Sequence, residues 1–207
     1  MHTQRIRSFV AVPLPGAVKA YLSKIQGFIR TVGGISASFP KTEGLHITIR
    51  FLGECSPQDF EIVKLAMDRA MIGHKPAMLR LGALGNFPKS AAKAKVLWIG
   101  LTGDLDRLQD IYRKLNSQLM HMEPYPSTAF SPHITLARIK NRLSQRTAER
   151  LMHIPYPLME NAPEFAAKEF ALYKSELLPH GAQHTLMHLS TTAGSTPVPS
   201  SGAPYYP

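Results

Sequence analysis

The sequence contains one cysteine, Cys55, in 207 residues. A single cysteine excludes a disulfide framework and any zinc site built on cysteines, and it fits a reducing compartment such as the cytoplasm. A nucleophilic cysteine needs a partnered base, so we interpret Cys55 as a small residue at the end of a strand. No run of about 18 apolar residues occurs, and we expect no transmembrane helix. Pro13, Pro15 and Lys19 interrupt the apolar stretch near the N-terminus, and we therefore expect no export signal.

Acidic residues are scarce, because 14 Asp and Glu stand against 24 Lys and Arg, giving a net charge of +10. This balance favours an anionic partner, most often a nucleic acid and less often an acidic lipid. A basic protein that is merely soluble carries the same charge. Lys89, Lys93 and Lys95 fall in one loop of small residues. We interpret this loop either as a patch that steers a phosphate backbone or as an ordinary solvated loop.

The 44% of apolar residues suffices for a sizeable core. Alternating and helical patterns follow one another along the chain. We expect strands near 6–12, 45–52, 77–84, 96–100, 133–139, 169–178 and 184–190. We expect helices near 17–32, 57–72, 104–121 and 144–153, the second with Ser56 as its N-cap and Pro57 at its first position. The class is mixed α and β with antiparallel pairing.

One tetrapeptide pattern occurs twice, as His46-Ile47-Thr48-Ile49 and as His133-Ile134-Thr135-Leu136. Both copies lie in predicted strands, and each is followed by a predicted helix. Side chains alternate across a strand, so the histidine and threonine of each copy share one face and the aliphatic residues share the other. The chain therefore resembles two similar halves, and a twofold relation between them would bring both His-Thr pairs into one groove.

Such a groove suits attack on a phosphodiester, particularly a strained cyclic one. Two imidazoles with pKa values near 6.5 can work as a general acid and a general base at neutral pH. Two threonine hydroxyls can donate hydrogen bonds to the non-bridging phosphate oxygens. This chemistry needs no metal, and we expect no cofactor.

With these two motifs and their flanks, the chain resembles the 2H phosphoesterase superfamily. Within that superfamily it is similar to RNA 2′,3′-cyclic phosphodiesterases of the LigT/ThpR type. The resemblance runs in order from about residue 5 to 190, through the stretches 8–15, 44–54, 85–88, 96–100, 130–138 and 172–177. It implies an α+β bilobal fold, in which two lobes of antiparallel sheet backed by helices and related by a pseudo-twofold axis face a central cleft. We accordingly expect one bilobal domain over residues 1–190 and a disordered tail over 191–207.

The resemblance also implies a function and a site. It implies hydrolysis of RNA 2′,3′-cyclic phosphate ends, or of nucleoside 2′,3′-cyclic phosphates, to 2′-phosphomonoesters, with reversible 2′–5′ RNA ligation in some members. His46 and His133 are then the acid and the base, in an order that a symmetric pair leaves open. Thr48, Thr135 and Arg138 then hold the phosphate. We expect a cytoplasmic monomer with no membrane contact.

Strand alternation raises a difficulty for Arg138. It stands an odd number of positions after His133, so it reaches the same face only if the strand ends or bulges near Ala137. Arg50 is in phase with His46 and is a rival phosphate contact. By the same parity Phe51 is expected in the core.

Other residues receive less specific expectations. Trp98 lies in a β-run and is expected in the core, whereas Phe87 is a candidate for stacking on a base. His180, His184 and His188 recur at four-residue steps, but the strand pattern around them and the absence of a nearby acid argue against a metal site.

Two alternatives to RNA cyclic phosphate hydrolysis stay open. The first is a catalytically silent module that binds RNA ends or nucleotides. The second is a 2H phosphodiesterase for a non-RNA cyclic phosphate or for 2′–5′ oligoadenylate. Two titratable imidazoles favour an enzyme, because a pure binding module does not need them.

Overall fold

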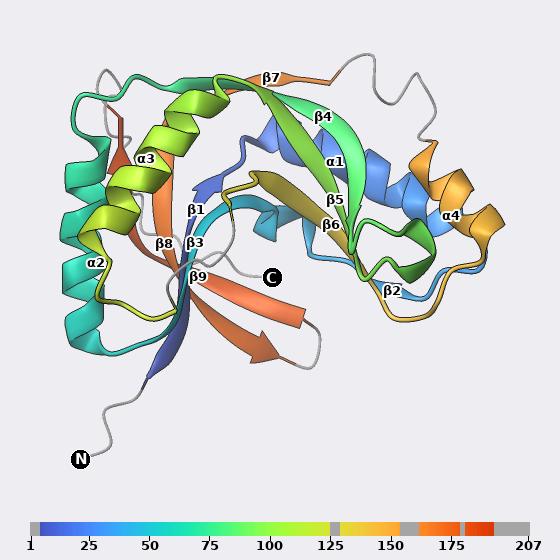
Figure 1. Cartoon of the computed structure of the whole chain (residues 1–207), viewed down its shortest axis with the longest axis horizontal. Helices are drawn as coiled ribbons and strands as arrows, with labels where there is room; N and C mark the ends of the chain where they lie inside the picture. The colour runs from blue at the N-terminus through green and yellow to red at the C-terminus, as the bar shows by residue number, and fades with distance from the viewer. Residues whose placement is uncertain (1–4, 125–128, 154–161, 179–180, 193–207) are drawn as a thin grey trace.

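The computed structural model describes residues 5–124, 129–153, 162–178 and 181–192, and Figure 1 shows the arrangement of their helices and strands. The first half of the chain contains β1, α1, β2, β3 and α2. Their bounds are Ile6–Pro13, Gly16–Thr31, Ala37–Ser38, His46–Cys55 and Pro57–Met71. The capping of α2 is as predicted, because the Ser56 hydroxyl accepts from Asp59 N–H and the Asp59 carboxylate accepts from Ser56 N–H.

The second half continues with β4, β5, α3, β6 and α4. Their bounds are Ala77–Phe87, Val96–Gly103, Leu105–Gln118, His133–Ile139 and Gln145–Met152. Three strands follow, β7 at Glu164–Ala167, β8 at Glu169–Leu178 and β9 at Gly181–Thr191. Two single turns of 3₁₀ helix, η1 at Thr42–Gly44 and η2 at Ala91–Lys93, precede β3 and β5. Every predicted helix and strand is present. The short strands β2 and β7 are additional, and residues 193–207 of the predicted tail lie outside the described residues.

The strands form two antiparallel sheets. One has the order β3-β1-β8-β9 and the other the order β2-β6-β5-β4-β7. The unit β1-α1-β3 of the first sheet has a counterpart, β5-α3-β6, in the second. This confirms the predicted α+β fold with two similar halves.

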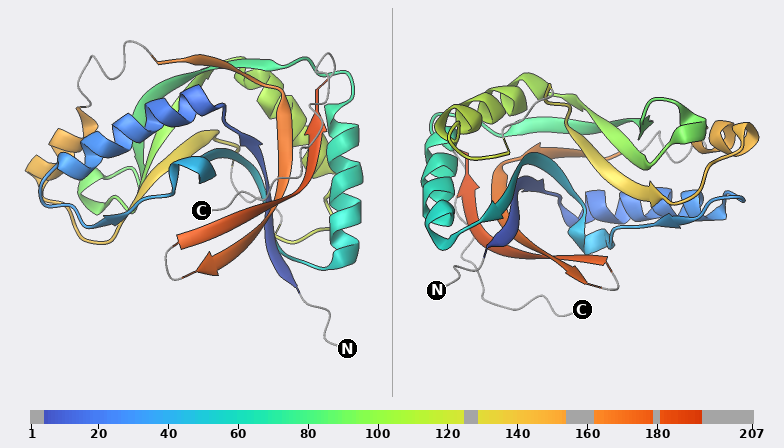
Figure 2. Two further views of the ribbon diagram at one scale, coloured as in Figure 1. Left: turned by 180° about the vertical axis from the view of Figure 1, so that it is seen from behind. Right: turned by 60° about the horizontal axis from the view of Figure 1, so that its bottom comes forward.

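The two halves exchange their helices. Helix α1 follows β1 of the four-stranded sheet but lies along the five-stranded sheet (Figures 1 and 2). There the buried Gln26 side chain donates a hydrogen bond to the Leu136 carbonyl of β6. Helix α3 follows β5 of the five-stranded sheet but packs beside α2, and its Asn116 accepts a hydrogen bond from Arg50 of β3. One continuous cluster of buried apolar residues accordingly runs through both halves. Its burial is the main stabilising contribution to the fold.

Candidate active site

The two motif histidines occupy matching places, as the first residues of β3 and β6. From the histidine onward, the first seven residues of each strand show the same sequence of half-buried, buried and exposed side chains. In both strands the histidine and the threonine are half-buried on one face, and the residues next to them are buried. Strands β3 and β6 also contact each other, so the two motifs meet where the two sheets meet.

Each histidine makes the same hydrogen bond to the turn before its strand. His46 Nδ1 lies 2.7 Å from the Gly44 carbonyl oxygen, and His133 Nδ1 lies 2.7 Å from the Ser131 carbonyl oxygen. A carbonyl oxygen only accepts, so Nδ1 carries the proton in both rings. Each neutral imidazole therefore presents Nε2 as its basic nitrogen, which is the arrangement a general base requires.

A β-bulge lies at the last residue of each motif. In β6, Ala137 pairs with Leu97 and Thr135 with Trp98, so Leu136 is an extra residue without its own partner. In β3, Arg50 pairs with Val10 and Thr48 with Ala11, so Ile49 is the extra residue. Each bulge inverts the alternation of side chains beyond it.

The bulge in β6 resolves the parity of Arg138. Leu136 and Ala137 are both buried, and the exposed Arg138 returns to the face that carries His133 and Thr135. The sequence allowed Arg138 at the phosphate only if such a bulge was present, and the structure contains it.

The bulge in β3 overturns two expectations. Arg50 is a rival phosphate contact by sequence, but it is 2% exposed and points toward the C-terminal end of α3. Its guanidinium donates to Asn116 Oδ1 at 2.5 Å and to the carbonyl oxygens of Leu119 and Met122 at 2.9 Å. Phe51 was expected in the core but is 56% exposed, and it occupies the position that Arg138 has in β6.

A buried polar side chain from the exchanged helix lies at each bulge. Gln26 of α1, 1% exposed, donates to the carbonyl of the bulge residue Leu136 at 3.0 Å and to that of Pro40 at 3.1 Å. In the other half, Asn116 of α3 accepts from Arg50, the residue after the bulge. A buried amide without partners is costly, so Gln26 holds the backbone of the β6 bulge directly, whereas Asn116 holds the side chain that follows the β3 bulge.

The surroundings of His46 are the more enclosed. Its ring stacks on Phe9 with a centroid separation of 4.8 Å, and the ring of His184 meets it edge-on at 5.5 Å. Lys19 of α1 donates to the Glu43 carbonyl at 2.7 Å and so supports the turn whose Gly44 carbonyl accepts from His46. Burial lowers the pKa of His46 to about 4; the hydrogen bond to Gly44 acts in the opposite direction, and electrostatic interactions with His184, Lys19 and His133 add to the lowering.

The surroundings of His133 are built from aromatic side chains of β4 and β5. The His133 ring lies 5.3 Å from Phe87 and 5.7 Å from Trp98, measured between centroids. The indole lies across Gly85, where a Cβ atom would approach its ring to 2.3 Å, so only glycine permits this arrangement. Trp98 was expected in the core but is half-buried at His133, as a wall of the site.

Sequence reasoning missed three residues of the site. His184, Lys19 and Phe9 come from β9, α1 and β1, and no short-range pattern connects them with His46. Burial lowers the pKa of His184 as well, and the positive charge of Arg7 lowers it further. His188 lies elsewhere, bonded to Asp68 of α2 at 2.9 Å, and His180 is outside the described residues.

The part of the chain that the structure describes contains no group of three His, Cys, Asp or Glu placed to hold a metal ion. Beside Phe51 it contains a hollow of about 330 Å³, which is lined by Arg7, Ser8, Phe51, Gly53, Glu54 and Pro124. No helix among the described residues is long and apolar enough to cross a membrane.

Comparison with known families matches the chain twice. The model of the family described as LigT like Phosphoesterase matches residues 12–98 and again residues 99–183, so each match contains one His-x-Thr motif. The chain is a LigT-like phosphoesterase. The family match therefore agrees with the internal repeat that the motifs and the two sheets show.

Named relatives of this phosphoesterase extend over nearly its whole length. An RNA 2′,3′-cyclic phosphodiesterase of Methanocaldococcus jannaschii is 28% identical over 181 residues, which are 85% of this chain and 95% of that protein. A protein of the same name from Thermus thermophilus is 30% identical, with 91% of each chain covered.

Solved structures show the same fold. A crystal structure of a Thermus thermophilus protein has a TM-score of 0.73 and 25% identity, and the match covers 92% of this chain and 100% of that one. The apo structure of E. coli LigT has a TM-score of 0.70 at 23% identity, with 91% and 98% covered.

Proposed function

We propose that this LigT-like phosphoesterase hydrolyses 2′,3′-cyclic phosphates at RNA ends, or in nucleosides, to 2′-phosphomonoesters. The matched anchoring of His46 and His133 carries this proposal, because both rings are fixed through Nδ1 and both offer Nε2 on one face beside a threonine. The relatives named RNA 2′,3′-cyclic phosphodiesterase support the choice of substrate.

The mechanism follows from paired acid and base catalysis. One Nε2 accepts a proton from water as the water oxygen bonds to phosphorus. The P–O3′ bond breaks on the opposite side, and the Nε2–H of the other histidine protonates the departing 3′ oxygen. The 2′ oxygen keeps the phosphate. Thr48, Thr135 and Arg138 donate hydrogen bonds to the non-bridging oxygens, whose charge grows in the transition state.

The proton state of His46 changes during this cycle. With its pKa lowered to about 4 by burial, His46 is neutral in the free protein at neutral pH. A bound phosphate brings an opposite charge close to His46 and raises its pKa, and one of the two motif rings then carries the proton that the leaving oxygen needs. A substrate with sulfur in place of the 3′ oxygen identifies the ring that acts as the acid. A thiolate leaves without being protonated, so this substrate restores turnover only in the histidine variant that lacks the acid.

The exposed ring of Phe51 and the hollow beside it offer a place for the nucleobase. Stacking on an aromatic face is worth about 1–3 kcal/mol per base. We therefore expect Phe51→Ala to raise KM for a cyclic nucleotide with little change in kcat.

The test uses adenosine 2′,3′-cyclic phosphate in EDTA, with the two monophosphate isomers separated by chromatography. We expect a 2′-monophosphate product, and a loss of about 10²–10⁴-fold in kcat for His46→Ala and for His133→Ala. His153→Gln, at an exposed histidine directly after α4, is the matched control and keeps wild-type turnover. Wild-type turnover in both alanine variants contradicts the assignment. Tight binding without turnover by the wild type favours the silent binding module.

Ligation needs the same groups. The 5′-hydroxyl of a second RNA takes the place of water: one histidine accepts its proton as its oxygen bonds to phosphorus, the P–O3′ bond breaks, and the other histidine protonates the 3′ oxygen, which leaves a 2′–5′ linkage. We include this ligation in the proposal as a second use of the same site. We also retain a cytoplasmic monomer as part of the proposal, in keeping with the single buried Cys55.

A further inference from the structure

Two segments of the chain are basic and contain no acidic residue. Residues 77–103 and 129–148 together hold eight Lys or Arg and no Asp or Glu. Of these eight cations, Arg80 forms an ion pair, with Glu164 of β7. Five of the other cations stand in the loops at one end of the five-stranded sheet, are exposed, and form no ion pair with another described residue. We call them the basic rim: Lys89, Lys93, Lys95, Lys140 and Arg142.

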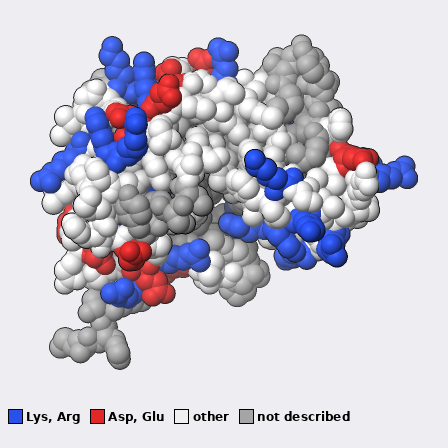
Figure 3. Space-filling model, viewed as in Figure 1, with Lys and Arg blue, Asp and Glu red and all other residues white. Residues whose placement is uncertain are grey.

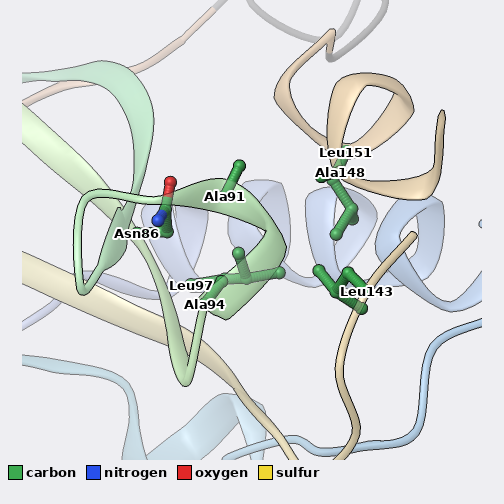
Figure 4. Close-up of a pocket in the computed structure, with 7 residues that line it drawn as sticks. All are labelled: Asn86, Ala91, Ala94, Leu97, Leu143, Ala148 and Leu151. Carbon is green, nitrogen blue, oxygen red and sulfur yellow. The ribbon is translucent and has the colours of Figure 1, made fainter. Parts of the chain in front are cut away.

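The fold holds the parts of the basic rim together. The Lys95 carbonyl accepts from Ile139 N–H at 2.8 Å, and Leu143 N–H donates to the Ala92 carbonyl at 3.3 Å. Behind these bonds, apolar side chains of η2, β5 and α4 face one another across a small cavity (Figure 4). The lining residues are Asn86, Ala91, Ala94, Leu97, Leu143, Ala148 and Leu151. The rim therefore has a fixed shape, although its cations come from two loops.

The basic rim continues from the phosphate end of the site. Arg138 of β6 pairs with Val96, the first residue of β5, so it lies close to Lys95, which precedes β5, and two positions before Lys140, which follows β6. Figure 3 shows Lys and Arg side chains gathered on the half of the molecule that contains the five-stranded sheet, with few acidic side chains among them. A cation series that starts at Arg138 and leads away from His133 is suited to a chain of phosphates.

We propose that the basic rim binds the phosphate backbone of the RNA strand that precedes the cyclic end, so that oligonucleotide ends are better substrates than mononucleotides. This inference rests on the proposed function. Single-stranded nucleic acid fits the rim because its phosphates pair with Lys and Arg one by one. The rim cations stand in turns and strand ends among small residues and are not on one face of an amphipathic helix, as membrane-surface binding would require.

The test compares adenosine 2′,3′-cyclic phosphate with a single-stranded decaribonucleotide that ends in a 2′,3′-cyclic phosphate. The variant carries Lys93→Gln, Lys140→Gln and Arg142→Gln, and it leaves Arg138 and both motifs intact. We expect kcat/KM for the decamer to fall about tenfold or more at low salt, with mononucleotide kcat/KM unchanged. The slope of log Kd for the decamer against log salt should become shallower by about 0.7 for each phosphate that the variant no longer neutralises.

A matched control separates this local effect from net charge. Arg69→Gln, Lys75→Gln and Arg113→Gln remove three exposed cations from α2, the turn after it, and α3. An equal effect from both triple variants, or an equal loss for decamer and mononucleotide, overturns the inference. If the wild type turns over neither substrate, the proposed function fails, and the salt dependence of decamer binding still decides whether the rim contacts RNA.

Discussion

At the scale of single residues, the two motif histidines are alike in anchoring and unlike in environment. Both donate Nδ1–H to the carbonyl two positions earlier, but only His46 is also enclosed by Phe9 and His184. Burial takes water away from the protonated ring and destabilises it, and this loss of hydration is the main cause of the lowered pKa of His46.

This enclosure predicts an abnormal titration. In the free protein, the NMR resonance of the His46 ring proton at Cε1 should titrate with a midpoint near 4. Inorganic phosphate bound beside His46 should shift that midpoint upward, because it adds an opposite charge. The assignment of the resonance rests on its absence in His46→Ala. A midpoint near the ordinary histidine value of about 6.5 without phosphate would mean that water reaches the ring freely.

At the scale of the elements, the bulges decide which side chains share a strand face with the motif histidines. The alternation in 45–52 and 133–139 identified both strands and placed each His-Thr pair on one face. It failed beyond Thr48 and Thr135, because nothing local in Ile49-Arg50 or Leu136-Ala137 marks an extra residue. The register is set by the neighbouring strand and by a polar side chain from a distant helix. For the same reason the sequence misplaced Arg50 and Phe51, and it could place Arg138 only conditionally.

The contribution of Gln26 to the β6 bulge can be tested by substitution. Gln26→Met keeps the side-chain volume but leaves the Leu136 and Pro40 carbonyls without the amide, at a cost of about 1–3 kcal/mol in the free energy of unfolding. We expect KM for the cyclic phosphate to rise as well, because the bulge that directs Arg138 loosens, while the pH dependence of kcat is kept. Val18→Ala removes buried apolar area from the same helix and serves as the control. An equal rise of KM in both variants would show that Gln26 contributes only to stability.

At the scale of the whole molecule, the exchange of helices makes the two halves depend on each other. Each sheet is covered by a helix from the other half, and one apolar core joins them. We expect urea unfolding in a single transition. The fluorescence of Trp98, which belongs to the five-stranded sheet and is the one tryptophan of the chain, should follow the same curve as far-UV circular dichroism. Two separated curves would show that the halves unfold independently.

Three histidines with lowered pKa values add a dependence on pH to this stability. Burial lowers the pKa values of His46, His74 and His184, so between the folded and unfolded pKa values the unfolded chain binds more protons. The free energy of unfolding is therefore expected to fall as the pH drops below about 6.5, with each such histidine contributing at most about 1.4 kcal/mol per pH unit. Urea midpoints measured from neutral to mildly acidic pH give this slope, and His46→Ala should make it shallower.

The helix exchange also bears on how product leaves. Two lobes joined only by a linker could move apart by a hinge motion. Here α1 of the first half is bonded to β6 of the second, and α3 of the second half is bonded to β3 of the first. Separating the two halves would have to pull Gln26 from β6 and Arg50 from α3 at once, together with the apolar contacts around them. We therefore expect the two motif histidines to keep a fixed separation. In the proposed reaction the 2′-phosphomonoester then leaves by diffusion, and turnover should respond to solvent viscosity as free diffusion does, without a slow opening step.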